Sequence, residues 1–507
     1  MNKQETNTIF GVSSSWLIVI FIAILVSGFT VRLFDLTDPP LGYAATRQLR
    51  AALIARGIYY KHTQTEPEWK REIAITQGQL PIIEPPIIES LAAATYWIIG
   101  SEHIWIARIY SSLFWVLGGI ALFFLVREMV STDGAFIALT YYLFNPFGIV
   151  VSRNFQPESL MTALIILAWW TFYRWHCART WKWAILAGLS AGLVIFVKFT
   201  SVFFLLGGMA VVVLMNKKFK EFIQDAQMWV VVLLSVLPAI LYSAYGVLIS
   251  GTLGQQFQGR FFPELWSELK FYTQWKNSLA GTSGREFVLV AGLIGLFFIR
   301  DRVKLGFLLG IWIGYIIYGF VFSYHFMTHS YYHLPVIPLL AISTGALVEY
   351  VLQWMRKFEK LKLNILARVG LLIIVLLGLS GGYYKLHKED YRHEPDWYYN
   401  VASFIDREAK LVALTQDYGH RIRYYGWITL SNWEGTADIE HDALQGEEIT
   451  PFSERFAEYA GNFDYFLVTR MNEFERQKEL YDELYNNYTI YKEGGGYIIF
   501  DLKQPLK

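Results

Sequence analysis

The chain has 507 residues, of which 54% are hydrophobic and only 17% are charged, and its mean hydropathy is +0.32. This composition is too apolar for a soluble protein of this size. The formal net charge of +1, with no arginine-rich or aromatic-interleaved basic tract, excludes nucleic acid as a partner.

Apolar runs recur along the first 385 positions, and about 20 helical residues are needed to cross a hydrocarbon core of about 30 Å. The sequence therefore predicts a polytopic α-helical membrane protein with about 11 transmembrane helices. The predicted spans are 15–34, 104–126, 134–151, 159–175, 183–197, 199–215, 228–249, 287–299, 305–322, 334–354 and 365–384. Lys and Arg are concentrated in alternate loops, which the positive-inside rule assigns to the cytoplasm. We expect a bacterial-type inner-membrane protein whose other loops and C-terminal tail lie on the outer, periplasmic or extracellular, side.

The first outer loop, residues 35–103, gathers acidic and basic groups where a membrane span ends, which favours an active site at the bilayer surface. Asp35 or Asp38 could act as general base and take a proton from an acceptor hydroxyl or amine. Arg47 and Arg50 could bind phosphate through charge-assisted hydrogen bonds. The alternative is that Asp38 caps a turn before proline and that the arginines extend to lipid headgroups.

The same loop contains two predicted helices. The stretch Phe34 to Tyr60 runs into an amphipathic helix with Leu49, Leu53 and Ile54 on one face, which we expect to lie on the membrane. Pro85 to Gly100 has the composition of a span, but counting it as one would invert the sidedness of every later loop. Its length, Glu89 and Pro-Pro start favour a juxtamembrane or re-entrant helix.

Three further charged residues interrupt apolar sequence near membrane edges. Placing the Glu84 carboxylate, in IIEPPII, within an apolar run at a membrane edge costs free energy unless it is paired. Glu84 therefore either forms a structural ion pair or contacts substrate or metal. Arg153 and Glu158, in VSRNFQPES, occupy a very short outer loop and face either headgroups or a cavity; we favour the cavity.

Lys198 lies in GLVIFVKFTSVFF, where two short spans must meet on the outer side. Its ammonium is well placed to hold a lipid phosphate, although extension to the headgroups is the default expectation for such a lysine. His325, His329 and His333 recur every four residues, but this spacing alone is weak evidence for a metal site. Together with Tyr331 and Tyr332, they suit an interfacial aromatic belt or hydrogen bonds to a phosphate.

The tail, residues 386–507, is rich in charge and tyrosine and predicts a small soluble α/β domain with its own core. The predicted helices are Trp397 to Ala409 and Asn472 to Asn487, and the predicted strands are Leu411 to Thr415, Tyr465 to Thr469 and Tyr497 to Phe500.

The order of these parts resembles the GT-C superfamily of membrane glycosyltransferases, in the branch of protein O-mannosyltransferases and lipid A aminoarabinose transferases, which is glycosyltransferase family 39-like. The parts are a first span, an acidic outer loop with an amphipathic helix, a Glu-Pro-Pro segment, a second acidic loop, a lysine after GLVIFV, and a Tyr-Tyr-His-Leu-Pro-x-Ile-Pro span. The match covers roughly residues 15 to 385, and only the order of the short motifs is specific. It implies a transmembrane GT-C catalytic domain over residues 1–385, followed by the extracytoplasmic lobe.

The resemblance implies transfer of a sugar from a polyprenyl-phosphate carrier, such as undecaprenyl phosphate, to a protein, lipid or glycan acceptor on the outer face of the membrane. It places the base at Asp38 or Asp35 and the second acidic position at Glu158. The further carboxylate falls on Glu84, and the phosphate-binding lysine on Lys198. No cofactor is implied with certainty, although a divalent metal could bind at Glu84 and Glu158.

One departure from the family pattern concerns the base. Relatives often carry Asp-Glu directly before the amphipathic helix, where this chain has Ala44 and Ala45. An inactive envelope assembly subunit therefore stays open, as does a flippase or transporter for a lipid-linked sugar, since intramembrane charges also mark translocation routes.

Overall fold

The computed structural model describes residues 8–10, 12–81, 84–216, 221, 223–249, 260–356 and 362–506. The chain forms two compact units. The first, here the helical unit, contains Met1–Leu36, Ile82–Ile87 and Arg108–Lys388. The second, here the mixed unit, contains Thr37–Pro81, Ile88–Ala107 and Glu389–Lys507.

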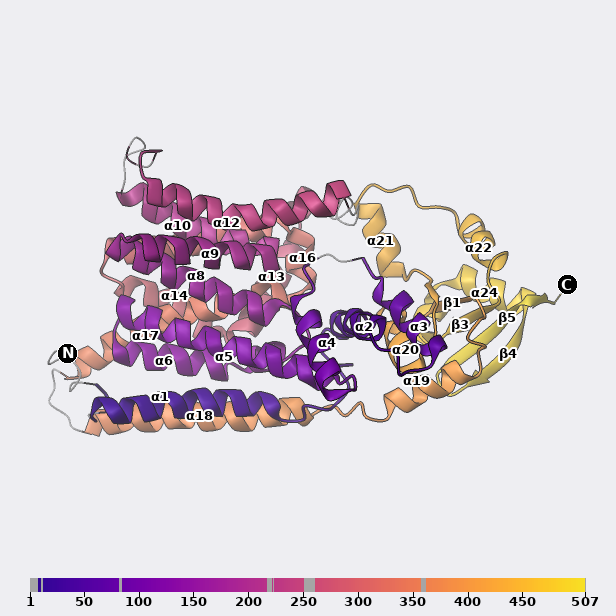
Figure 1. Cartoon of the computed structure of the whole chain (residues 1–507), viewed down its shortest axis with the longest axis horizontal. Helices are drawn as coiled ribbons and strands as arrows, with labels where there is room; N and C mark the ends of the chain where they lie inside the picture. Colours follow the sequence, from indigo (N-terminus) through magenta and orange to yellow (C-terminus); the bar gives the residue numbers. More distant parts are fainter. Residues whose placement is uncertain are drawn as a thin grey trace. The chain divides into compact units, whose positions relative to one another are not determined.

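The helical unit is built from long apolar helices joined by short turns (Figure 1). Its elements are α1 Ser14–Thr30, η2 Val31–Leu33, α5 Ile104–Met129, α6 Thr132–Phe144, α7 Pro146–Val151, α8 Glu158–Ala178, α9 Trp181–Val197, η3 Phe199–Ser201, α10 Val202–Asn216, α12 Ala226–Ala244, η4 Tyr245–Ile249, η6 Pro263–Ser267, α13 Leu269–Ser283, α14 Glu286–Gly295, η7 Leu296–Phe298, α15 Arg302–Val321, α16 Ser323–Thr328, η8 Ser330–His333, α17 Val336–Arg356 and α18 Lys362–His387.

Every predicted span coincides with helical structure. Within the described ranges, six helices are long and apolar enough to cross a membrane: Ser14–Leu33, Ile104–Met129, Ala226–Leu248, Arg302–Val321, Ser330–Arg356 and Ile365–His387. A seventh candidate is the pair Leu269–Ser283 and Glu286–Phe298, which is bent by 84°. The chain is therefore an integral membrane protein, and the count of about 11 crossings stays a prediction because the other helices are shorter or less apolar.

The predicted span 134–151 is two helices, because Asn145 and Pro146 break it. Asn145 ends α6 and caps α7, since its Oδ1 accepts the backbone N–H of Gly148 at 2.8 Å. Pro146 occupies the first position of α7, where the missing N–H costs no helical hydrogen bond. The break directs the chain into the turn that precedes α8.

Glycines set the closest helix contacts in the helical unit. Gly188 and Gly192 of α9, spaced as GxxxG, lie against Leu234 of α12 so closely that a Cβ at either position would collide with it, so this spacing serves helix packing. In the same way, Gly207 of α10 lies directly against the backbone of Gly310 in α15. These contacts leave no room for side chains between the paired helices.

The mixed unit combines helices with one sheet (Figure 1). Its elements are α2 Ala45–Lys61, α3 Glu68–Gly78, α4 Ile87–Ile99, α19 Glu394–Ser403, β1 Leu411–Leu414, η9 Gln416–Gly419, α20 His420–Gly426, β2 Ser431–Asn432, α21 Thr436–Leu444, α22 Phe452–Ala460, β3 Tyr465–Val468, α23 Met471–Arg476, α24 Lys478–Asn487, β4 Tyr488–Gly494 and β5 Tyr497–Pro505.

The sheet has the order β2-β1-β3-β5-β4. Strand β1 is parallel to β2 and β3, whereas β5 is antiparallel to β3 and β4. The three strands that the tail pattern predicts are confirmed as β1, β3 and β5, and the predicted helix 472–487 is divided at Gln477 into α23 and α24. Val412, Phe466 and Phe500 are fully buried in the core of this sheet.

The sequence predicts that the apolar face of α2 lies on the membrane. For the residues at the centre of that face, this prediction is wrong. Leu49 and Leu53 are fully buried inside the mixed unit. The reason is that α2 packs on α3, where Gly57 meets Gly78, and also on α20 from the tail. An amphipathic helix needs an apolar partner, and here protein supplies it instead of lipid.

A buried arginine joins α2 to the tail. Arg56 forms an ion pair with Glu102 at 2.8 Å and donates to the backbone oxygen of Tyr424 at 2.7 Å. Its guanidinium also lies 3.8 Å from the ring centroids of both Tyr424 and Trp427. Residues 37–81 and 88–107 thus share a compact unit with the tail.

Candidate functional site

The position of Lys198 follows from a helix pair. Helix α8 begins at Glu158, turns back at Arg179 and Thr180, and α9 packs along it and ends at Val197. Because the two helices run in opposite directions, the start of α8 and the end of α9 lie at the same end of the pair. Lys198 is the first residue after α9, with extended backbone angles.

Lys198 is held by two carboxylates from other segments. Its Nζ lies 2.6 Å from Glu158 Oε1 and 3.1 Å from Glu84 Oε1. Lys198 is 6% exposed and Glu158 is 1% exposed, so the pair is shielded from solvent. The helix dipoles favour both charges, since Glu158 opens α8 and Lys198 follows the last turn of α9. The structure therefore unites three of the charged residues that the sequence singled out.

This cluster places two carboxylates beside one ammonium. Glu84 and Glu158 could supply two oxygen ligands to a divalent cation whose remaining ligands come from a substrate phosphate, a pattern typical of Mg²⁺. Over the described part of the chain, no three or more His, Cys, Asp or Glu side chains are grouped so as to hold a metal ion by themselves. A protein-only metal centre is therefore not formed by these residues.

Two tyrosines cover the ammonium. The ring centroids of Tyr331 and Tyr332 each lie 5.5 Å from Lys198 Nζ, and both residues are 7% exposed. They belong to η8, which leads into α17. At this distance the ring faces attract the cation, and more strongly away from water. The Tyr-Tyr pair thus belongs to the lysine cluster.

The neighbouring histidines differ in their surroundings. His333 is fully buried, with Nδ1 2.7 Å from the Tyr315 hydroxyl and Nε2 3.1 Å from the backbone oxygen of Phe326. Both of its nitrogens are thus engaged within the protein. His329 is partly exposed, and its Nδ1 lies 2.7 Å from Thr328 Oγ1. The geometry offers His329 to a ligand more readily than His333.

Arg153 fastens the turn before α8 to the end of the first helix. Its guanidinium donates to the backbone oxygens of Phe34 and of Asp35, the latter at 2.7 Å. Asp35 has a φ of 49°, in the left-handed region that few non-glycine residues adopt. Arg153 thus holds backbone in place, and it brings the Asp35 segment beside the turn that leads to Glu158.

The other first-loop candidates lie in the mixed unit. Asp38 Oδ1 accepts the backbone N–H of Tyr391 at 2.9 Å and lies 3.6 Å from Arg392 Nη1. Arg50 donates to the backbone oxygen of Pro81. Arg47 is half-buried in the first turn of α2. Asp38 therefore has a definite structural partner in the tail, which its sequence context did not reveal.

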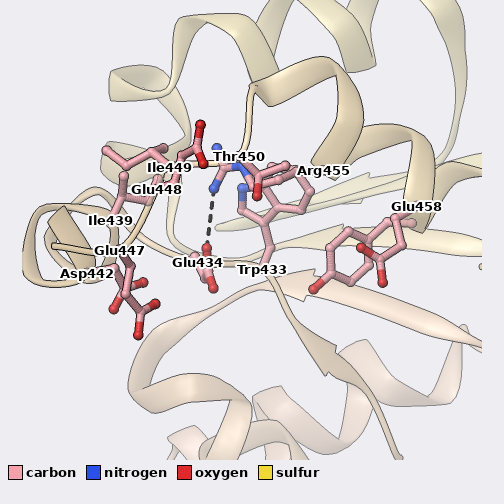
Figure 2. Close-up of a pocket in the computed structure, with 11 residues that line it drawn as sticks. Trp433, Glu434, Ile439, Asp442, Glu447, Glu448, Ile449, Thr450, Arg455 and Glu458 are labelled. Carbon is pink, nitrogen blue, oxygen red and sulfur yellow. Dashed lines mark hydrogen bonds and ion pairs between the residues drawn. The ribbon is translucent and has the colours of Figure 1, made fainter. Parts of the chain in front are cut away.

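A cavity of about 250 Å³ between α21 and α22 was not anticipated from the sequence. Figure 2 shows the ion pair between Arg455 and Glu434, which is 3.3 Å long. The Arg455 guanidinium also lies 5.3 Å from the ring centroid of Trp433. The other charged lining residues are all acidic: Asp442, Glu447, Glu448 and Glu458. Five carboxylates against one guanidinium repel an anion. An anionic ligand such as a phosphate is therefore disfavoured in this cavity.

Comparison with known proteins gives a family match over the segment that carries this cluster. Residues 83–242, which include Glu84, Glu158 and Lys198, match the family described as dolichyl-phosphate-mannose-protein mannosyltransferase. No curated protein matches the sequence.

The fold matches solved glycosyltransferases over nearly the whole chain. ArnT from Cupriavidus metallidurans in the apo state matches with a TM-score of 0.64 and 15% identity, covering 96% of this chain and 98% of ArnT. The same protein bound to undecaprenyl phosphate gives 0.62 and 14%, covering 97% and 98%. The chain has the GT-C fold of these membrane proteins.

A more distant likeness connects this fold to an oligosaccharyltransferase. The Archaeoglobus fulgidus enzyme, tethered to an acceptor peptide with the NVT sequon, matches with a TM-score of 0.53 and 13% identity, covering 98% of this chain and 75% of that enzyme. At such identities the structural likenesses establish the fold, whereas sugar and acceptor need separate arguments.

Proposed function

We propose that this protein is a glycosyltransferase that moves a sugar from a polyprenyl-phosphate carrier to an acceptor hydroxyl or amine on the outer face of the membrane. The observation that carries the proposal is the buried Lys198, held by Glu158 and Glu84 at a helix junction. A buried ammonium with two carboxylates is costly unless it serves a ligand. The solved ArnT with undecaprenyl phosphate and the mannosyltransferase family description support a lipid-phosphate donor.

The proposal assigns roles along the chain. Residues 1–385 form the catalytic part in the membrane, and residues 386–507 form a lobe on the outer side of a bacterial-type inner membrane. The acceptor is a protein, lipid or glycan. Residues of the first outer loop, Asp38 or Asp35, or Glu158 in the second, are the candidates for the base. Arg47 and Arg50 are candidates for additional phosphate contacts.

In the reaction, an acceptor oxygen or nitrogen attacks the anomeric carbon while the bond from that carbon to the phosphate oxygen breaks. The electron pair of the broken bond leaves with the polyprenyl phosphate, and the acceptor proton passes to the carboxylate base. Lys198 stabilises the charge that grows on the leaving phosphate, and this stabilisation is strong because the group is already oriented and shielded from water. A single direct displacement inverts the anomeric configuration, so a product with retained configuration would contradict it.

The test uses purified full-length protein in liposomes with radiolabelled undecaprenyl phosphate mannose and a membrane extract as acceptor source. Lys198→Ala is expected to lower transfer by about 10²- to 10³-fold, the usual cost of one preorganised group that stabilises transition-state charge. Lys304→Ala is the matched control, because Lys304 also lies at a helix end but donates to the backbone oxygens of Glu128 and Met129. Full transfer by the Lys198 variant would refute the role. Movement of the lipid across the bilayer without transfer would favour a flippase.

A further inference from the structure

We propose that the turn between α7 and α8, residues 152–157, binds and recognises the sugar of the donor. In this assignment Gln156 exchanges hydrogen bonds with a sugar hydroxyl, and Asn154 donates one more to a donor oxygen. The inference rests on the proposed function, because it places the sugar next to the phosphate that Lys198 would hold.

The observation is a pair of buried amides without hydrogen bonds. Gln156 is 2% exposed, and neither its Nε2 nor its Oε1 has a hydrogen-bond partner among the described residues. Asn154 is 5% exposed, and no described group accepts from its Nδ2. Buried polar atoms are almost always paired, since leaving one unpaired costs about 1–3 kcal/mol. Three such atoms within one short turn indicate that something outside the chain satisfies them.

Hydrogen bonds hold the backbone of the turn firmly in place. The backbone N–H of Gln156 donates to the oxygen of Asn154 at 2.8 Å. Ser152 anchors the start of the turn, because its Oγ accepts from Arg32 at 2.6 Å and its backbone oxygen accepts from Ser159 Oγ at 2.8 Å. Arg153 adds the bonds to the Asp35 segment. The backbone of the turn is thus fixed, and the side chains of Asn154 and Gln156 are buried on it.

The chemistry of the unpaired atoms narrows the ligand class. Gln156 offers one donor group and one acceptor, which matches a hydroxyl, since a hydroxyl both donates and accepts. A phosphate diester only accepts, and a polyprenyl chain does neither. A sugar hydroxyl is therefore the part of the donor that suits Gln156, whereas the Asn154 donor suits a hydroxyl, ring or phosphate oxygen.

The position of the turn agrees with that assignment. Gln156 is two residues before Glu158, so their Cα atoms are at most about 7 Å apart. Glu158 in turn contacts Lys198 at 2.6 Å. In a polyprenyl-phosphate sugar the sugar is bonded directly to the phosphate, so a phosphate at Lys198 puts sugar hydroxyls within reach of this turn. In VSRNFQPES the charged residues Arg153 and Glu158 flank two amides, Asn154 and Gln156. Two amides in so short a polar break between apolar runs are the signal in the sequence for this site.

The experiment compares binding of the bare lipid with binding of sugar-bearing lipids. Purified full-length protein is titrated with undecaprenyl phosphate and with undecaprenyl phosphate carrying mannose, glucose or aminoarabinose. The variants are Gln156→Met, which keeps length without polar atoms, Gln156→Leu as a second apolar replacement, and Lys198→Ala. The matched control is Thr162→Val, because Thr162 is equally buried but its Oγ1 already donates to the backbone oxygen of Glu158 at 2.8 Å.

We expect wild type and Thr162→Val to bind one sugar-bearing lipid more tightly than the bare lipid. Gln156→Met and Gln156→Leu are expected to lose about tenfold of this preference, the value of a buried hydrogen bond, while keeping their affinity for the bare lipid. Without lipid, both variants should unfold at the same temperature as wild type or above it, because removing an unsatisfied amide relieves a penalty.

Three binding results would each overturn the inference. They are an unchanged preference in both Gln156 variants, an equal loss of affinity for bare and sugar-bearing lipids, or a wild type that prefers no sugar-bearing lipid. A drop of several degrees in the lipid-free unfolding temperature of both Gln156 variants would do the same, since it would show that a trapped water satisfies the amide. By contrast, undecaprenyl phosphate binding that survives Lys198→Ala would count against the proposed function itself.

Discussion

Lys198 Nζ lies 2.6 Å from Glu158 Oε1, although 40 residues separate the two in the chain. Both side chains are buried, so each charge depends on the other for stability. Removing one partner of a buried pair typically costs about 3–5 kcal/mol, whereas replacing both is often much less harmful. The ion pair thus keeps either charge from being buried without compensation.

The first prediction follows from this pair. Lys198→Met and Glu158→Gln are each expected to lower the unfolding temperature in detergent, and the double variant should recover part of the loss. Transfer activity should stay absent in the double variant, because stability returns without the cation. A double variant as unstable as the sum of the single ones would show that the two side chains act independently.

Tyr331 and Tyr332 provide the second prediction. Because their rings face Lys198 at 5.5 Å, replacing both by Phe keeps the cation–π contact, and replacing both by Leu removes it. We expect the Leu pair to weaken undecaprenyl phosphate binding several-fold and the Phe pair to retain it. Equal losses in the two variants would point to the hydroxyl groups instead of the ring faces.

The helices and the lysine cluster were largely predictable because their signals are local. An apolar run of sufficient length indicates a helix without reference to the rest of the chain. Lys198 and Glu158 lie at the ends of an antiparallel helix pair, so charge at those two ends predicts proximity. For Glu84 the sequence indicated either an ion pair or a contact with substrate or metal, because a lone carboxylate in apolar sequence is costly, but it did not identify Lys198 as the partner.

Other features could not be predicted, because a periodic pattern of apolar residues indicates a buried face but does not show what covers that face. Leu49 and Leu53 define an apolar face whether lipid or α20 covers it, and only tertiary packing decides. The bond from Tyr391 to Asp38 joins residues 353 positions apart, and neither residue carries a local sign of it. Asn145 followed by Pro146 is typical of a helix cap before a proline. The hydropathy of residues 134–151 nevertheless favoured a single span.

Asp38 gives the third prediction, since it is both a candidate base and a structural acceptor. Asp38→Asn keeps an oxygen for the N–H of Tyr391, whereas Asp38→Ala removes it. If Asp38 is the base, both variants lose activity and only the Ala variant loses stability. If its role is structural, the Asn variant retains most of its activity. Transfer assays and unfolding temperatures on the same preparations separate the two cases.

Ala44 provides the fourth prediction. It precedes α2 with a φ of 53°, a left-handed conformation that costs an alanine roughly 1–2 kcal/mol. Ala44→Gly is expected to raise the unfolding temperature, because glycine adopts this conformation without the steric cost. Ala45→Gly is the control, since Ala45 is the first residue of α2 and should be destabilised by glycine. A destabilised Ala44→Gly protein would contradict the strain argument.

His420 gives a prediction about pH. Burial, followed by the nearby positive charges of Arg423 and Arg50, lowers the pKa of His420 from 6.5 to about 3, against the opposing effect of Asp417. In the unfolded chain the imidazole binds a proton near pH 6.5, so the unfolded state takes up more protons as the pH falls. His420 therefore does not change the free energy of unfolding above about pH 7. Below that, the free energy of unfolding decreases progressively as the pH falls from about 6.5 towards 3.

The loss from this one group should reach about 2 kcal/mol at pH 5. His420→Leu removes the titration, so the unfolding temperature of this variant should fall less between pH 7 and pH 5 than that of the wild type. The partly exposed His441 of α21 supplies the matched control, His441→Leu, which should keep the wild-type pH dependence. If wild type and His420→Leu lost stability in parallel over this range, the buried imidazole would not be the group responsible.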